Sequence, residues 1–236
     1  GALPSINGSP FTGLTTAQQG TDTNGDPTLD TNKAVTLDAQ IFSFAIAGGG
    51  AGTVALNGSL ALNWIRNTVD AHISDNATVT TTATTGTVAV LADDAASMTV
   101  LAGSAGGAGT AAIGAGVAYN YIGGDPDDPS STAVNTIKAY VDNATVNAGE
   151  LEITARSAAT INALVVAVSG SGTFAGNGAI SLNWIRKHVD SHVSGGATVT
   201  TTKDVSILAS DVSIIRSIAG QISGSGTVAI GAAVAY

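Results

Sequence analysis

The stretch Leu62-Asn63-Trp64-Ile65-Arg66 indicates the architecture, because the chain repeats it as Leu182-Asn183-Trp184-Ile185-Arg186. The match continues downstream, where Val69-Asp70-Ala71-His72-Ile73 returns as Val189-Asp190-Ser191-His192-Val193. A weaker copy lies between the two, with Asn120-Tyr121-Ile122 in place of Asn-Trp-Ile. Motifs that recur in the same order are the signature of a repeat protein. The chain is therefore an array of similar units.

A Gly-x-Gly-Thr motif marks the start of each unit. Taken at its threonine, the motif places units near Thr53, Thr110, Thr173 and Thr227, with spacings of 57, 63 and 54 residues. The units differ in length only in polar loops, so the segments between the loops keep fixed lengths. The last unit stops at Tyr236, inside the repeat, and we expect the chain to be part of a longer array.

Composition and local pattern favour β structure. The 236 residues are 44% hydrophobic and only 11% charged, and they include 30 glycines. Valine, threonine and glycine are abundant and good helix formers are scarce, which argues against long helices. Apolar residues alternate with period 2, as in β-strands, over five segments: Val69–Ile73, Val88–Ala92, Ile137–Val141, Leu151–Ala155 and Val189–Val193.

The sequence predicts an all-β parallel β-helix over residues 44–236, with residues 1–43 as a non-repeating polar cap or linker. A unit of this length divides into about three coils of roughly 20 residues each, which would stack to about 50–60 Å. One segment favours an alternative. Residues 161–185 are apolar on both faces and fold about Ser169-Gly170-Ser171-Gly172, as in an antiparallel hairpin. An antiparallel, hairpin-rich β-sandwich is therefore the second fold hypothesis.

The first 43 residues contain one candidate metal site. Asp22, Asn24 and Asp26 alternate like the start of a calcium loop. An EF-hand loop would need glycine where Pro27 stands and glutamate where Lys33 stands. A solvated turn stabilised by Asp and Asn side chains is the other interpretation. Calcium is the one cofactor considered, and no other is predicted.

The repeated acid and histidine pairs are candidates for chemistry. Asp70 with His72, and Asp190 with His192, stand two residues apart on strands, so each pair projects from one face. A carboxylate beside an imidazole suits a general base or half a metal site. With three coils per unit the two pairs would lie six coils apart, roughly 29 Å. They could not share a substrate atom, and we interpret them as surface pairs.

The aromatic residues of the repeat are candidates for packing. We expect Trp64, Tyr121 and Trp184 to fill a corner of the core rather than to form a sugar-stacking platform. The neighbouring asparagines would satisfy backbone groups at that corner. One whole unit apart, they would be too distant to form an amide ladder.

Charge and cysteine content exclude several classes. The net charge of −9 argues against nucleic acid and anionic membranes as partners. The absence of cysteine excludes disulfides, thiolate zinc sites and iron–sulfur clusters. No uninterrupted apolar run approaches the roughly 20 residues of a membrane helix.

The ordered set of motifs resembles a known class of proteins. The pattern Gly-x-Gly-Thr, then Asn-[Trp/Tyr]-Ile, then Val-x-Ala-x-Ile and Asn-Ala-Thr-Val over about residues 44–236 resembles the repeats of large bacterial surface adhesins. Their kin are filamentous-haemagglutinin-like exoproteins of two-partner secretion and leukotoxin-like autotransporter passengers. The resemblance implies export across an outer membrane, a β-solenoid stalk, and a role in attachment or aggregation.

The function expected is therefore that of a secreted, non-catalytic structural or adhesive segment at the bacterial cell surface. The expected partners are other copies or adjoining repeats at the C-terminal edge, and a cell-surface glycan or protein. Two alternatives stay open. One is a polysaccharide-acting enzyme of β-helix type, which would need carboxylates converging on one outer groove. The other is a subunit of a self-assembling extracellular filament.

Overall fold

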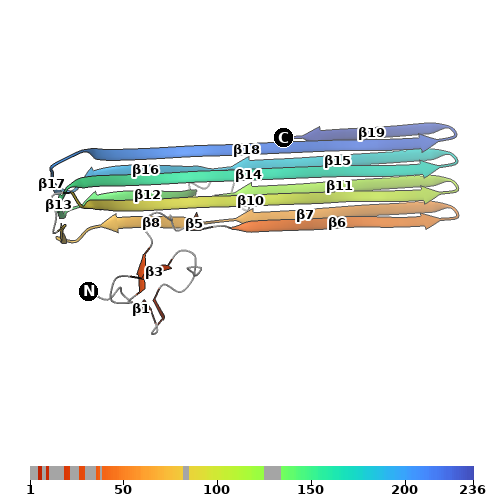
Figure 1. Ribbon diagram of the computed structural model, residues 1–236. Helices are drawn as coiled ribbons and strands as arrows, with labels where there is room; N and C mark the ends of the chain where they lie inside the picture. Colours follow the sequence, from red (N-terminus) through yellow and green to blue (C-terminus); the bar gives the residue numbers. More distant parts are fainter. Residues whose placement is uncertain are drawn as a thin grey trace.

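The computed structural model describes residues 5–6, 9–10, 19–21, 27–29, 36–37, 39–81, 85–124 and 134–236. These residues form β-strands and turns, and none of them is helical. The strands of residues 40–236 stack in parallel, which confirms the predicted parallel β-helix (Figure 1). The five predicted strand segments all lie within observed strands. The candidate calcium loop, Asp22 to Asp26, lies outside the described residues.

One repeat unit forms one coil of the helix. The first coil contains β6 (Gln40–Ala51), β7 (Val54–Ile65), β8 (Thr68–Ile73) and β9 (Thr78–Thr80). The second contains β10 (Thr87–Ala108), β11 (Ala111–Ile122), β12 (Asn135–Asp142) and β13 (Thr145–Ala148). The third contains β14 (Glu150–Ser171), β15 (Phe174–Ile185), β16 (Lys187–Ser194) and β17 (Thr198–Thr201). A fourth coil follows with β18 (Val205–Ser225) and β19 (Val228–Ala235).

Equivalent strands of successive coils pair with each other and form four sheets. We call β5 (Thr36–Leu37), β6, β10, β14 and β18 the long sheet, and β7, β11, β15 and β19 the arch sheet. The third sheet is β8, β12 and β16, and the fourth is β9, β13 and β17. Each pair is in register with the sequence repeat, so that Asn120 lies opposite both Asn63 and Asn183.

This register corrects the prediction of three coils per unit. A coil contains a whole unit of 57 or 63 residues, as the spacing between partnered asparagines shows. The prediction assumed coils of roughly 20 residues, but the strands continue through glycine-rich runs without turning. Gly103, for example, stays in the ladder and pairs with both Ile46 and Val166. The coils are therefore wide, and the four of them rise only about 14 Å from first to last rather than 50–60 Å.

The hairpin alternative is also wrong for the repeat array. β14 and β15 belong to different sheets and pack face to face across the turn at Gly172 and Thr173. The backbone hydrogen bonds of β14 and β15 go to the equivalent strands of the neighbouring coils, and not between β14 and β15. Among the described strands, antiparallel pairing occurs only between β1 (Ser5–Ile6) and β2 (Ser9–Pro10), and between β3 (Gln19–Thr21) and β4 (Pro27–Leu29).

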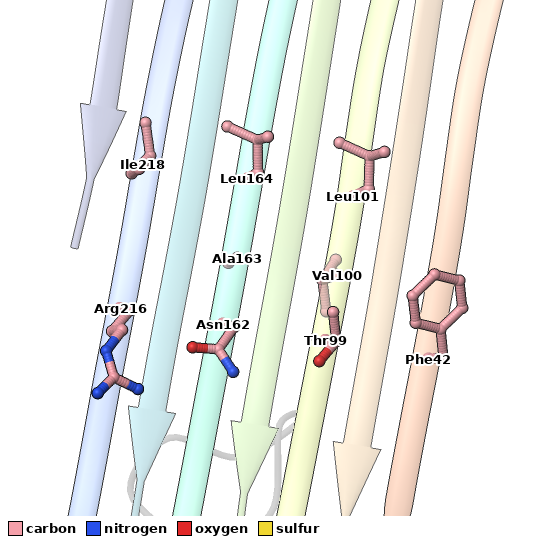
Figure 2. Close-up of a pocket in the computed structure, with 9 residues that line it drawn as sticks. All are labelled: Phe42, Thr99, Val100, Leu101, Asn162, Ala163, Leu164, Arg216 and Ile218. Carbon is pink, nitrogen blue, oxygen red and sulfur yellow. The ribbon is translucent and has the colours of Figure 1, made fainter.

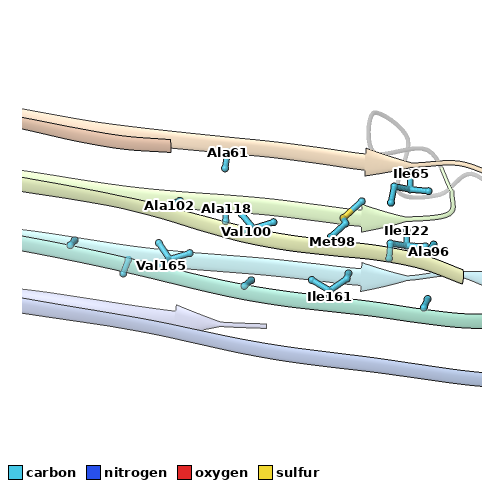
Figure 3. Packing of buried hydrophobic residues seen from close by; sticks show 14 residues of the cluster. Ala61, Ile65, Ala96, Met98, Val100, Ala102, Ala118, Ile122, Ile161 and Val165 are labelled. Carbon is cyan, nitrogen blue, oxygen red and sulfur yellow. The ribbon is translucent and has the colours of Figure 1, made fainter. Parts of the chain in front are cut away.

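Two thin hydrophobic cores lie side by side within the coils. The first fills the space between the long sheet and the arch sheet, and it contains Met98, Val100, Ile161 and many alanines (Figure 3). The second lies between the other half of the long sheet and the third and fourth sheets, around Ile137, Leu151 and related residues. The small inward side chains let the two layers approach closely, because interiors pack without voids.

A buried polar layer separates the two cores. The Asp94 carboxylate is fully buried and accepts hydrogen bonds from Asn67 Nδ2 at 2.9 Å and Ser157 Oγ at 3.4 Å. Lys187, whose side chain is 1% exposed, contacts Ser157 Oγ at 2.5 Å and pairs with Asp211 Oδ1 at 3.0 Å. Buried charges require such partners, so the layer holds this part of the coil in one register.

Candidate interaction surfaces

Most exposed side chains on the outer side of the arch sheet are large and apolar, whereas alanine and asparagine occupy much of its inner side. In β7, Ala55, Ala61 and Asn63 point inward and are buried, whereas Leu62 is 67% exposed. None of the four strands of this sheet contains a charged residue. We call its outer surface the arch face. Its most exposed apolar side chains are Val54, Leu56, Leu60, Leu62, Ile113, Ile180, Val228, Ile230 and Val234.

A ladder of aromatic rings crosses the arch face. The register places Tyr121 between Trp64 and Trp184. The Tyr121 and Trp184 ring centroids are 5.8 Å apart, and Tyr119 lies 4.9 Å from Trp184. Tyr236 extends the cluster at 5.7 Å from Trp184. Aromatic rings at these separations attract each other beyond the gain from burial.

The expectation that the tryptophans fill the core is wrong. Trp64 is 42% exposed and stands on the arch face, whereas Tyr121, at 3% exposed, is the buried member of the ladder. The reason is strand alternation: because Asn63 and Ile65 both point inward, Trp64 must point outward.

The prediction that the asparagines are too distant to form an amide ladder is wrong, because they form one behind the aromatic rings. Asn63 Nδ2 donates to Asn120 Oδ1 at 2.8 Å, and Asn120 Nδ2 donates to Asn183 Oδ1 at 2.8 Å. Asn183 Nδ2 donates in turn to Ser217 Oγ at 3.0 Å. One unit per coil places the asparagines one ladder step apart, about 4.8 Å. The ladder holds each asparagine inward and so turns the aromatic ring beside it outward.

The long sheet presents a second apolar surface on the opposite side of the first core, which we call the long face. Phe42 is 76% exposed there, and Phe44, Ile46, Leu164 and Ile218 are also exposed. An open hollow on this face lies between two rows of side chains, one with Phe42 and Arg216 and the other with Leu164 and Ile218 (Figure 2). It has a volume of about 400 Å³. Arg216 is the only charged residue among those that line it.

The third sheet presents a polar stripe on its outer face. His72, Tyr140 and His192 form one row, in which the Tyr140 ring stacks between the two imidazoles at centroid distances of 5.0 and 5.1 Å. The adjacent row contains Asp70, Lys138 and Asp190. His72 Nδ1 lies 2.8 Å from Asp70, and His192 Nδ1 lies 2.9 Å from Asp190.

The acid and histidine pairs are therefore two coils apart, about 10 Å, and not six. The predicted separation of 29 Å was wrong because each unit is one coil. The Tyr140 ring nevertheless keeps the two imidazoles from meeting. Desolvation, followed by the charges of Asp70 and Asp142, raises the pKa of Tyr140 above its ordinary value of 10.0.

In the described part of the chain, no three His, Cys, Asp or Glu side chains gather in a way that could hold a metal ion. The same residues include no helix long and apolar enough to cross a membrane.

Comparison with known proteins gives no relative. No protein-family model matches the chain, and neither the curated proteins nor the solved structures contain a match.

Proposed function

We propose that the chain is a non-catalytic structural and adhesive segment of an extracellular bacterial surface protein. The main support is the arch face, a surface of exposed aliphatic and aromatic side chains on four strands that contain no charged residue. Contiguous apolar patches of this kind mark interaction sites in soluble proteins. The centres of interfaces are depleted in charge and enriched in Trp and Tyr, as this face is.

The parallel stack provides the structural part of the proposal. Coils that pair edge to edge can continue along one axis, since each buries the backbone of the last. β18 and β19 stand at the ends of their sheets. In this proposal that edge pairs with adjoining repeats or with other copies of the chain, and the broad faces bind a cell-surface glycan or protein.

Bead retention tests adhesion through the arch face. Beads would carry the chain at a density too low for neighbouring chains to touch, and would flow over polystyrene, mucin and fibronectin surfaces. We expect the wild type to be retained at least tenfold better than Leu60→Asp/Ile180→Asp on one or more of these surfaces. Ala89→Asp/Ala158→Asp is the matched control, because both alanines are exposed on the charged half of the long sheet.

Two outcomes would contradict the proposal. One is retention of the wild type no better than that of bare beads on all three surfaces. The other is equal retention of the wild type and the arch-face variant.

One observation favours a polysaccharide-acting enzyme as the second candidate. Asp70 and Asp190 stand on one outer face, about 10 Å apart, with Lys138 between them. This separation approaches that of the two carboxylates in an inverting glycosidase. Release of new reducing ends from acidic polysaccharides, lost in Asp190→Asn, would support this function over the adhesive one.

A further inference from the structure

We infer that the arch face of one copy of this chain binds the long face of a second copy, so that the chains stack laterally. This inference deepens the proposed function, on which it rests, by naming a second copy as one partner of the arch face. It differs from continuation along the coil axis, because here the broad faces meet and the strand edges stay free.

The two faces are large enough for a stable interface. Each covers four strands at about 4.8 Å spacing and about 12 residues at 3.3 Å, which gives roughly 750 Å². A standard interface between proteins buries about 800 Å² on each partner. Both faces belong to the same half of the coil, since β6 is followed directly by β7 across the Gly52–Thr53 turn.

The shapes of the two faces are complementary. The hollow of the long face lies over the rows that contain Phe42 and Leu164 (Figure 2). On the arch face, Leu60, Ile180 and Val234 share one row of exposed side chains that stands above the strand surface. A hollow that receives such a ridge removes apolar surface from water on both sides.

The polar groups of the two faces are compatible as well. Arg216 is the only charged residue at the hollow, and the four strands of the arch sheet contain no charged residue. The cation that reaches the arch face is Arg186, which follows β15 and donates to the Tyr121 hydroxyl at 3.4 Å. The arch face does offer the exposed ring of Trp64 and the partly exposed ring of Trp184. A guanidinium packs favourably over an aromatic face, so the partner provides a suitable neighbour for Arg216.

The position of the faces determines the kind of assembly. They lie on opposite sides of the first core and are different surfaces, so their contact is heterologous. A heterologous contact that does not close into a ring continues without limit. A chain with both faces intact therefore forms oligomers that grow with concentration.

Sedimentation equilibrium of the purified chain tests this inference without any binding surface present. Two variants each disable one face: Leu60→Asp/Ile180→Asp on the arch face, and Phe44→Asp/Leu164→Asp on the long face. The apparent mass of the wild type should rise with concentration to several times the monomer mass of 23.0 kDa. Each variant alone should remain a monomer. An equimolar mixture should form a species of twice the monomer mass, because each variant retains the face that the other lacks.

Ala89→Asp/Ala158→Asp should associate like the wild type, and circular dichroism should show the same β structure in all variants. A monomeric wild type over the whole concentration range would overturn the inference. A dimer of the long-face variant alone would also overturn it, because the arch face would then bind a second arch face. Wild-type binding to neutral phosphatidylcholine vesicles without self-association would assign the faces to lipid instead. Bead retention at low density with a monomeric chain in solution would contradict only this inference and leave the adhesive function standing.

Discussion

At the scale of single residues, Asn120 connects three coils through its side chain. Its Oδ1 accepts from Asn63 and its Nδ2 donates to Asn183, all within the buried interior. Asn120→Ala would leave one donor and one acceptor buried without partners. We expect a loss of about 2–4 kcal/mol in the free energy of unfolding, measured by denaturant titration. Asn147→Ala, on a partly exposed position of β13, should change it by less than about 0.5 kcal/mol. Equal losses in both variants would show that the ladder adds no stability.

A second residue-scale prediction concerns Tyr140. Its pKa is raised by desolvation and by the neighbouring carboxylates, Asp70 first among them. The folded chain therefore holds the phenol proton to a higher pH than the unfolded chain. The resulting stabilisation is complete below about pH 10 and is lost as the pH rises through the folded-state pKa.

Asp70→Asn should lower the pKa of Tyr140, because it removes a neighbouring negative charge. The increase in pKa that is due to desolvation should remain. The wild type and Asp70→Asn would each be titrated by phenolate absorbance, with and without the additional substitution Tyr140→Phe. Subtracting the curve of the Tyr140→Phe form leaves the titration of Tyr140 alone. Asp204→Asn is the control, since Asp204 is exposed and lies just before β18, outside the third sheet. An unchanged titration in Asp70→Asn would mean that the carboxylate does not act on the phenol.

At the scale of elements, the turn between the long and arch sheets requires glycine once coils are stacked. A Cβ on Gly172 would overlap the carbonyl oxygen of Gly109 in the preceding coil. The same motif position in the first coil, Gly52, has open space around it. Gly172→Ala should therefore cost about 1–3 kcal/mol by overpacking, measured by thermal unfolding. Gly52→Ala, at the matched site, should stay within about 0.5 kcal/mol of the wild type. A stable Gly172→Ala chain would mean that the coils are further apart at this turn.

At the scale of the whole molecule, the width of the coil distinguishes the observed architecture from the predicted one. Thr87 and Ala105 lie on one continuous strand, β10, and are about 60 Å apart. In coils of roughly 20 residues they would be near neighbours, within about 10 Å. The chain has no cysteine, so Thr87→Cys/Ala105→Cys can be spin-labelled without further changes. Pulsed electron paramagnetic resonance on the labelled chain, diluted in unlabelled chain, should give the long distance. A pair at Thr87 and Glu150, which are ladder partners, should give strong short-range coupling.

The sequence by itself determined that the chain is a β repeat, where its strands lie, and where its Gly-x-Gly-Thr turns fall. These are local properties, set by period-2 alternation and by the recurrence of short motifs. Only the tertiary structure decided how many residues a coil contains, because the chain closes a coil where its backbone finds a pairing partner, and that partner is one whole unit away. The same long-range pairing brought Asn63, Asn120 and Asn183 into one buried ladder. It thereby decided that the aromatic residue beside each asparagine faces outward, since alternation specifies two faces but only packing selects which of them is inside.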